Sequence, residues 1–470
     1  MNVGVAYSPG VSAIDPARLE TCLAVFAELE SLPPDHPDVL AVRRATARLY
    51  KAVKQGRRQA RRAAMTANDL SVTAATATGA TGRIDDETRG IPLVSQTIGA
   101  SAGTLKRPRA CYVCKDRYVE VDAFYHQLCP PCAKFNRERR DARTDLTGRR
   151  ALLTGGRAKI GMYIALRLLR DGAHTTITTR FPNDAVRRFA AMPDSADWLH
   201  RLRIVGIDLR DPAQVVALAD SVLEAGPLDI LINNAAQTVR RTPGAYGHLV
   251  AAESAPLPSG PLPEVFALHR PSASALPASS VSPHALTALA LTSGALQSTV
   301  DAGGLVPDVD AVNSWTRRVH EVDPVELLEV QLCNATAPFI LISKLRPAMA
   351  SSSARRTYVV NVTAMEGQFT RRYKGSGHPH TNMAKAALNM LTRTSAEEMF
   401  TDGILMTAVD TGWITDERPH PTKLRLADEG FHAPLDLVDG AARVYDPIVR
   451  GELGEDLYGC FLKDYNPSAW

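Results

Sequence analysis

The sequence lacks a long apolar run, a strong excess of one charge and a recognisable leader segment. No stretch of its 470 residues approaches the roughly 18 uninterrupted apolar residues that cross a bilayer, so we expect no membrane association. The first residues lack a charged segment followed by an apolar run, and we therefore expect no secretory signal. The net charge of +4 is too small to indicate a partner by itself. These absences predict a cytoplasmic protein.

Residues 1–70 are predicted to form a helical hairpin with one strongly basic helix. Apolar side chains recur at helical spacing over 15–30, and a second helix is expected over 36–68. From Arg43 to Arg62 this helix has nine Lys/Arg and no acid. The basic face is either solvated or a surface for phosphates or an acidic partner, and the near absence of aromatics argues against base stacking. Its members at three-, four- and seven-residue steps are Arg44, Arg48, Lys51, Arg58 and Arg62.

The seven cysteines are too few and too unevenly spaced for a disulfide framework, but four of them have metal-ligand spacing. Cys111 and Cys114 form one CxxC pair, and fourteen residues separate it from the pair of Cys129 and Cys132. Two such turns complete a tetrahedron of thiolates for zinc, with no open position, so the ion is expected to be structural. The intervening segment alternates like a hairpin, which predicts a zinc ribbon or treble-clef knuckle over 109–136.

This knuckle can dock a partner, contact nucleic acid or staple a segment too small to have its own core, and the sequence leaves these alternatives open. The preceding residues, 71–108, are rich in Thr, Ala, Gly and Ser and are expected to be a linker.

From residue 150 onward, strand-like and helix-like apolar periodicities alternate. Strands are expected over 150–156, 174–180, 202–209 and 228–236, with amphipathic helices between them. This order predicts an α/β domain with a doubly wound parallel sheet, in which a ligand lies at the carboxyl ends of the strands. A Pro-, Ser- and Ala-rich stretch over 241–310 is expected to be a mobile insertion, with one short helix near His284.

Several motifs of this half resemble those of the short-chain dehydrogenase/reductase family, in the family's order. The segment 154–161, TGGRAKIG, resembles the phosphate loop TGxxxGxG, with Lys159 in place of the middle glycine. The segment 233–236, NNAA, resembles the NNAG turn, and Asn334 matches the active-site asparagine. The segment 381–388, TNMAKAAL, resembles YxxxKxxL without its tyrosine. The resemblance implies a Rossmann-like dinucleotide-binding fold over 147–470.

The resemblance also implies which residues contact the nucleotide. Asp208 matches the aspartate that contacts adenine, and Gly412 falls at the turn behind the nicotinamide. The complete implied set is Thr154, Gly155, Arg157, Lys159, Ile160, Gly161, Arg180, Asp208, Asn233, Ala235, Lys385 and Gly412.

Arg180 decides the expected cofactor. It ends the second strand of this half, where NAD-binding members place an acid for the ribose hydroxyls. An arginine there, supported by Arg157 and Lys159, would attract a 2′-phosphate. NADP(H) is therefore expected in preference to NAD(H), unless Arg180 is merely an exposed side chain.

The residues that the resemblance assigns to proton transfer are partly missing. Family members use a tyrosine for the proton, a serine for the substrate oxygen, a lysine beside the ribose and an asparagine that orders a water. Asn334 and Lys385 keep the last two roles, whereas Thr381 and Ala364 stand at the tyrosine and serine positions. A threonine hydroxyl is a poor general acid at neutral pH.

Substitutes for the tyrosine lie just before Lys385. Tyr373, His378 and His380 are candidates, because histidine exchanges protons near pH 7. The histidines can equally cap the helix or contact the insertion. Glu366 is a further polar candidate, although it can also pair with a neighbouring arginine.

The sequence therefore predicts an NADP(H)-dependent oxidoreductase with an atypical site, acting on a small-molecule substrate that it does not name. The alternative is an inactive NADP(H)-binding scaffold that acts through the knuckle and the basic helix, where nucleic acid is one conceivable partner. The resemblance implies a homo-oligomer. The aromatic tail, with Tyr465 and Trp470, is expected to pack on a neighbouring subunit or over the substrate cleft.

Overall fold

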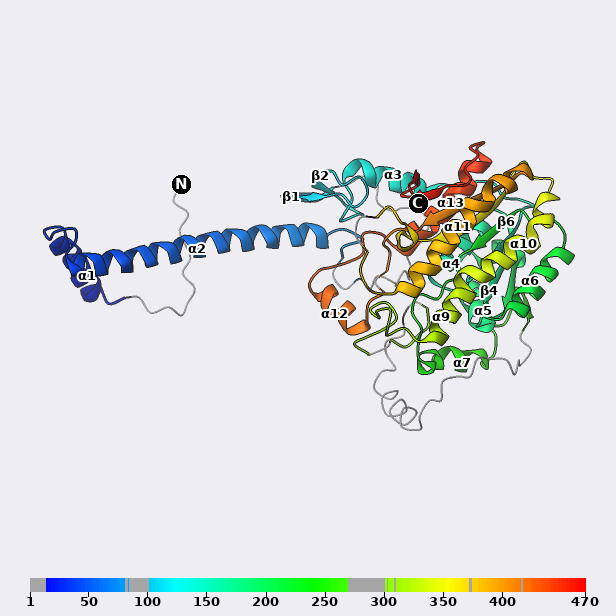
Figure 1. Ribbon diagram of the computed structural model, residues 1–470, viewed down its shortest axis with the longest axis horizontal. Helices are drawn as coiled ribbons and strands as arrows, with labels where there is room; N and C mark the ends of the chain where they lie inside the picture. The colour runs from blue at the N-terminus through cyan, green and yellow to red at the C-terminus, as the bar shows by residue number, and fades with distance from the viewer. Residues whose placement is uncertain are drawn as a thin grey trace. The chain divides into compact units, whose positions relative to one another are not determined.

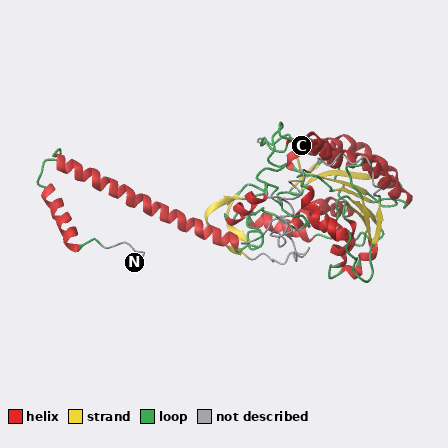
Figure 2. Ribbon diagram, turned by 90° about the horizontal axis from the view of Figure 1, so that it is seen from below, coloured by secondary structure: helices red, strands yellow, loops and turns green. Residues whose placement is uncertain are grey.

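The chain divides into two compact units, Met1–Asp69 and Leu70–Trp470. The structure is a computed structural model (Figures 1 and 2). It describes residues 14–80, 83, 101–268, 301, 303–307, 310–371, 374–415 and 417–470.

Helices α1 (Pro16–Leu29) and α2 (Pro37–Ala74) form where the apolar spacing predicts them. Asp15 caps α1, because its carboxylate accepts a hydrogen bond from the Ala17 amide at 3.0 Å. Helix α2 extends beyond its expected end, since no glycine or proline interrupts the chain between Gly56 and Gly79. All nine cations between 43 and 62 are exposed, as both a solvated face and a binding surface require.

A hairpin and a helix follow in the second unit. Strand β1 (Ser101–Ala110) pairs antiparallel with β2 (Arg117–Asp122), and α3 (Pro130–Asp141) begins directly after Cys129. The expectation of a linker over 71–108 is wrong at both ends, because α2 occupies its first residues and β1 its last. The hairpin expected between the CxxC pairs is also wrong: Cys111 and Cys114 lie in the turn, so β2 pairs with the strand that precedes them.

Within the described residues, nine strands form one sheet in the order β11-β10-β9-β8-β6-β3-β4-β5-β7. All neighbours are parallel except β10 and β11, so the predicted doubly wound parallel sheet is confirmed. The strands are β3 (Arg150–Leu153), β4 (His174–Thr179), β5 (Leu202–Gly206), β6 (Ile230–Asn233), β7 (Glu264–Ala267), β8 (Thr357–Thr363), β9 (Ile404–Asp410), β10 (Phe461–Lys463) and β11 (Asn466–Ser468).

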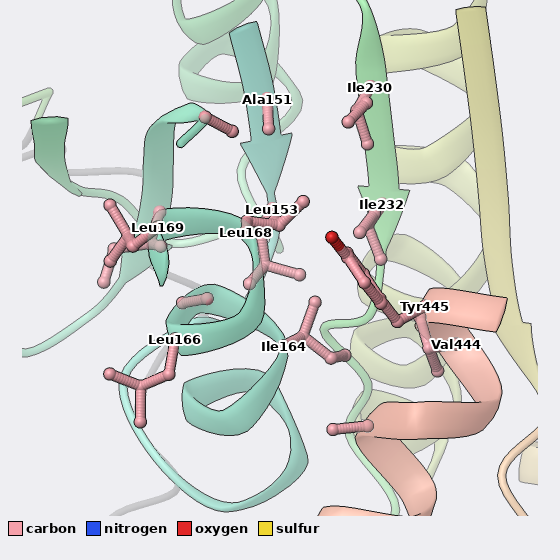
Figure 3. Close-up of a cluster of buried hydrophobic side chains, with 14 of the residues drawn as sticks. Ala151, Leu153, Ile164, Leu166, Leu168, Leu169, Ile230, Ile232, Val444 and Tyr445 are labelled. Atoms are coloured by element: carbon pink, nitrogen blue, oxygen red, sulfur yellow. The ribbon is translucent and has the colours of Figure 1, made fainter. Parts of the chain in front are cut away.

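Helices cover both faces of the sheet (Figure 2). Successive side chains of β3 alternate between the faces: Leu153 joins one buried cluster and Leu152 the other. In the first cluster, Ile164 and Tyr445 approach Ile232 (Figure 3). That face carries α4 (Lys159–Arg170), α5 (Pro182–Ala190) and α13 (Leu437–Glu452). The opposite face carries α6 (Pro212–Glu224), α10 (Ala337–Ala350) and α11 (Pro379–Thr401).

The helical run Pro324–Ala350 is long and apolar enough to cross a membrane by length and composition alone. It consists of α9 (Pro324–Gln331), a π-helical turn (Leu332–Thr336) and α10. Leu341 and Leu345 of α10 are fully buried in the cluster that α6 and the sheet share. One face of the run therefore packs on the sheet, and 44% of its apolar window is buried.

The first part of the predicted insertion is folded. Helix α7 (Gly247–Glu253) packs against α5, and β7 adds to the sheet beside β5, with Val265 opposite Ile204. The expectation of a mobile segment over 241–310 is thus wrong for these residues, because a short Val-Phe strand can extend the otherwise open edge at β5. The helix expected near His284 lies outside the described residues. Another short helix, α12 (His420–Asp428), follows β9.

The aromatic tail folds back on its own chain. Tyr465 is buried and packs against Phe135 of α3, with ring centroids 5.7 Å apart. Trp470 lies 6.1 Å from Phe461, measured between ring centroids. The expectation that Tyr465 packs on a neighbouring subunit is therefore wrong, because α3 covers it.

A buried ion pair joins α3 to the start of α13. Arg140 donates to both carboxylate oxygens of Asp436 at 2.7 and 2.9 Å, and its side chain is completely buried. It also lies 3.0 Å from Asp439, which in turn accepts a hydrogen bond from the Tyr125 hydroxyl at 2.6 Å. Burial would raise the pKa of Asp436, but Arg140 holds it below its usual range. The cysteine-containing segment is thus part of the same folded unit as the sheet.

Removing Arg140 should leave two uncompensated buried carboxylates. We expect Arg140→Ala to lower the free energy of unfolding by about 3–5 kcal/mol, measured by urea denaturation. Lys134→Ala on the same helix is the control, because Lys134 is exposed and its 4.0 Å pair with Glu138 is worth little. Equal stabilities of the two variants would contradict this account of how α3 is attached.

Candidate functional site

The loop after β3 has the tight geometry of an anion-binding turn. Gly155 has a φ of +71°, and a Cβ at Gly161 would overlap the Gly155 carbonyl oxygen. Only glycine permits this approach, which places the first turn of α4 directly over the end of β3. The amides at a helix N-terminus attract negative charge. The loop predicted from residues 154–161 is therefore present at the carboxyl edge of the sheet.

The turn after β6 braces this loop. The Thr154 hydroxyl accepts hydrogen bonds from the amides of Asn234 and Ala235, both at 3.0 Å. The Asn234 side chain donates to the carbonyls of Thr154 and Gly155, both at 3.1 Å. Asn233 instead donates to Asn361 of β8 at 2.8 Å, inside the sheet. Asn233 therefore holds two strands together, and Asn234 sets the shape of the loop.

The two cations of the loop already have acidic partners. Arg157 forms an ion pair with Asp184 of α5 and donates to the Gly303 carbonyl at 2.6 Å. Lys159, at a φ of +53°, lies 3.6 Å from Asp301. A segment near the end of the predicted insertion therefore lies against the phosphate loop, and a bound phosphate would compete with Asp301 for Lys159.

Arg180 is exposed at the carboxyl end of β4. Its guanidinium lies over the Tyr246 ring at 4.8 Å and donates to the Tyr246 hydroxyl at 3.1 Å. Asp208 forms an ion pair with Arg210 at 2.6 Å, which together with its hydrogen bonds holds its pKa below the usual range despite burial. Arg180 thus supplies positive charge at this edge beside an aromatic ring, and its charge also lowers the pKa of Asp208.

Two residues expected in the active site lie in well-defined surroundings. Asn334 is buried in the π-helical turn, where its side chain bonds to the Gln237 amide at 2.7 Å and carbonyl at 3.1 Å. The Lys385 ammonium donates to the Val362 carbonyl at 2.8 Å. Burial lowers the pKa of Lys385 to about 8, while the negative charge of Glu366 and Asp410 partly opposes that shift.

The candidate substitutes for the missing tyrosine are engaged elsewhere. The Thr381 hydroxyl donates to the His378 carbonyl at 2.9 Å, within the first turn of α11. His380 is buried and lies 3.3 Å from Glu326 of α9, so it faces the neighbouring helix. His378 stacks on Trp315 with ring centroids 3.8 Å apart, and its Nδ1 lies 2.9 Å from the Trp315 carbonyl oxygen. Tyr373 lies outside the described residues.

Asp410 is a buried acid that the motifs did not reveal. It ends β9 opposite Thr363 of β8, and its carboxylate accepts a hydrogen bond from the Gly412 amide at 3.0 Å. Burial raises its pKa to about 6, and the negative charge of Glu366 adds to that shift. The signal in the sequence is an acid at the end of an otherwise apolar strand. A second titratable group therefore lies near Lys385.

The four predicted metal ligands come together. The Sγ atoms of Cys111, Cys114, Cys129 and Cys132 all lie within 4.8 Å of one another. The 3.7 Å between Cys114 and Cys129 Sγ is close to the tetrahedral edge of about 3.8 Å that zinc–sulfur bonds of about 2.3 Å imply. The donor set and its spacing therefore fit a tetrahedral metal ion with no open position.

Comparisons with known proteins place these features in context. Residues 149–246 match the short chain dehydrogenase family. The chain is 31% identical over 357 residues to the uncharacterized protein R665 of Acanthamoeba polyphaga mimivirus, covering 72% of this chain and 71% of that one. A probable oxidoreductase of Streptomyces antibioticus is 42% identical over 94 residues, which span 19% of this chain and 30% of that one.

Among solved structures, the carbonyl reductase Sniffer of Drosophila melanogaster is 18% identical, with a TM-score of 0.44. That match covers 69% of this chain and 100% of the reductase.

The charged form of Lys385 should lower the free energy of unfolding, because its burial disfavours the ammonium. With a pKa of about 8 against 10.5 for a free lysine, the unfolded chain binds a proton here that the folded chain lacks between those pH values. The free energy of unfolding should therefore rise from pH 8 to 10.5, and the penalty is fully present below pH 8.

Lys385→Met should raise the free energy of unfolding at pH 7 by about 1–3 kcal/mol, as the side chain keeps some contact with water. It should also flatten the rise at alkaline pH. Lys344→Met, at an exposed position on α10, is the control and should change neither quantity. A Lys385→Met protein that is less stable than the wild type at pH 7 would show that the buried ammonium does not lower the free energy of unfolding.

Proposed function

The chain belongs to the short-chain dehydrogenase/reductase family as a divergent member, and on that premise we propose that it is an NADP(H)-dependent oxidoreductase with an altered proton relay. The observation that carries the proposal is the glycine loop at Gly155 and Gly161, which shares the carboxyl edge of the sheet with Lys385. A protein that had lost nucleotide binding would have no use for a close turn that only glycine can form.

The residues present fit a dinucleotide with a 2′-phosphate. A Cβ at Gly161 would overlap the Gly155 carbonyl oxygen, so glycine lets the first turn of α4 approach the loop closely enough for its amides to face a diphosphate. Arg180, exposed at the end of β4, is the residue that would hold the 2′-phosphate, with Tyr246 beside it. When bound, NADPH supplies the hydride, and the protein supplies orientation and exclusion of water.

We assign Lys385 as the general acid that donates the proton to the substrate. The Thr381 hydroxyl is held by the His378 carbonyl, and threonine is a weak acid near neutral pH. The Lys385 ammonium has a pKa of about 8, close to the operating range of a general acid. Its hydrogen bond to Val362 fixes Nζ at the end of β8 and leaves two N–H groups for a substrate oxygen and a ribose hydroxyl. In this proposal Asn334, in the π-helical turn, keeps the family role of ordering a water.

The four cysteines are proposed to hold a structural zinc ion. Four thiolates leave no coordination position for a substrate, so the ion would contribute to folding rather than to the reaction.

A second candidate function is an NADP(H)-binding scaffold without catalysis. It is favoured by Thr381 and Ala364, which stand in place of the family's tyrosine and serine, and by the fully exposed basic face of α2. Acidic partners, including nucleic acid, would bind that face. Assembly into a homo-oligomer and a cytoplasmic location stay predictions under either function.

The proposed function is tested by nucleotide titration followed by a scan of aldehydes, ketones and imines for NADPH oxidation. We expect NADPH to bind more tightly than NADH, and at least one carbonyl or imine class to be reduced. Activity should fall as pH rises through about 8, because the Lys385 ammonium is lost. Tight binding without turnover on any class would favour the scaffold, and binding of neither nucleotide would overturn both functions.

Arg180→Asp should weaken NADPH binding by about 10-fold or more while it leaves NADH binding within about 3-fold, because one charge-assisted phosphate contact is lost. Arg393→Asp, an equal change of charge at an exposed position on α11, is the matched control. Fluorescence titration gives all the dissociation constants. An unchanged ratio of NADPH to NADH affinity in Arg180→Asp would remove the phosphate assignment.

A further inference from the structure

The knuckle formed by 111–132 does not project from the nucleotide domain but packs into it. Its buried residues share one apolar cluster with Ile414, Leu435 and Leu437. Ile160, in the first turn of α4, also packs against this cluster. The metal-binding segment therefore contacts both the helix of the phosphate loop and the chain that follows β9.

Tyr112 makes the most specific of these contacts. It lies between the metal ligands Cys111 and Cys114, and its amide donates to the Gln127 carbonyl at 2.8 Å. Its hydroxyl oxygen accepts a hydrogen bond from the Trp413 amide at 2.8 Å. The CxxC turn that would be folded around a metal ion thus holds a backbone amide of the nucleotide domain.

The turn over 410–414 that receives this contact is tightly constrained. Gly412 has a φ of +80°, and a Cβ there would lie 2.7 Å from Leu435 and 3.5 Å from the Tyr112 hydroxyl. The Asp410 carboxylate accepts the Gly412 amide from inside the turn. Two hydrogen bonds therefore fix successive amides of the turn: the Gly412 amide donates to Asp410, and the Trp413 amide donates to the Tyr112 hydroxyl oxygen.

The place of β9 in the strand order shows which part of the site this turn borders. It follows β9, next to β8, so it lies at the same carboxyl edge as the glycine loop and on the Lys385 side. Ile414 and Ile160 meet at Gly440 of α13, which ties the turn to the start of α4. Arg180 follows β4, on the other side of β3. A dinucleotide with its 2′-phosphate at Arg180 therefore has its nicotinamide half beside the turn.

We propose that Tyr112 is a positioning residue for the nicotinamide half of the nucleotide site, and that the four-cysteine metal site serves this role by fixing the turn that carries it. The inference rests on the proposed function, since it presumes that the site binds NADPH. The knuckle is then a component of the cofactor pocket, and its link to the pocket is the hydrogen bond from the Trp413 amide to the Tyr112 hydroxyl.

The test compares two ligands in the intact chain. NADPH has both halves of the dinucleotide, whereas adenosine 2′,5′-bisphosphate has only the half expected at Arg180. In Tyr112→Phe, which keeps the ring and removes the acceptor, we expect NADPH to bind about 3- to 10-fold more weakly, as for one lost hydrogen bond. The affinity for adenosine 2′,5′-bisphosphate and the zinc content should stay as in the wild type.

Tyr118→Phe is the matched control, because the Tyr118 hydroxyl donates to the His126 carbonyl at 3.0 Å within the same knuckle and does not reach the turn. It should leave both affinities unchanged. Removal of zinc with a chelator should weaken NADPH binding in the wild type and in Tyr118→Phe, and add little to the loss in Tyr112→Phe.

Several outcomes would overturn the inference. Unchanged NADPH affinity in Tyr112→Phe would show that the hydrogen bond positions nothing. Equal weakening of both ligands would show a general role in folding. If the wild type binds adenosine 2′,5′-bisphosphate but chelation leaves NADPH binding intact, the metal site is independent of the pocket. A wild type that binds neither ligand refutes the proposed function itself, a result distinct from the other three.

Discussion

The close approach of Gly161 to the Gly155 carbonyl is the constraint on which the nucleotide site depends. Because no side chain separates them, the first turn of α4 lies over the end of β3 and points its amides toward the carboxyl edge of the sheet. Asn234 and Thr154 then hold the loop in this shape from the neighbouring strand β6. Every later element, from Arg180 at β4 to Lys385 at α11, is placed relative to that edge.

The second constraint is the attachment of the cysteine-containing segment. A small metal-binding module often folds independently, yet here Arg140 is buried against Asp436, which caps α13. Since α13 packs on α4, the module and the phosphate loop are parts of one packed layer. A change at the metal ligands is therefore expected to alter the geometry of the nucleotide site. The hydrogen bond from the Trp413 amide to the Tyr112 hydroxyl is the contact that links the two.

The sheet and its helices could be predicted from the sequence, because apolar periodicity and turn residues are local signals. Contacts between distant segments could not. His380 faces Glu326 of α9, and Lys159 faces Asp301 near the end of the predicted insertion, and neither pairing leaves a pattern in the sequence. The strand β7 was missed because its short apolar run lies within a Pro- and Ser-rich stretch. The cysteine cluster was predictable from spacing alone, whereas the use of Tyr112 was not.

In the proposed function, the chemistry of the site depends on the charge of Lys385 rather than on the family's tyrosine hydroxyl. Burial shifts the pKa values of both Lys385 and Asp410 toward neutrality, and the negative charge of Glu366 adds to the shift of Asp410 and opposes that of Lys385. Such a pair is costly in a folded protein and is typical of sites that exchange protons. In that proposal, the exposed Arg180 and the close glycine loop recognise the nucleotide.

A crystal structure of the chain with NADPH would test the proposed nucleotide site most directly. We expect the 2′-phosphate within hydrogen-bond distance of Arg180, the diphosphate at the first turn of α4, and the nicotinamide between Lys385 and the turn that Tyr112 holds. A nucleotide bound elsewhere, or an empty loop with Asp301 still paired to Lys159 at saturating NADPH, would contradict it.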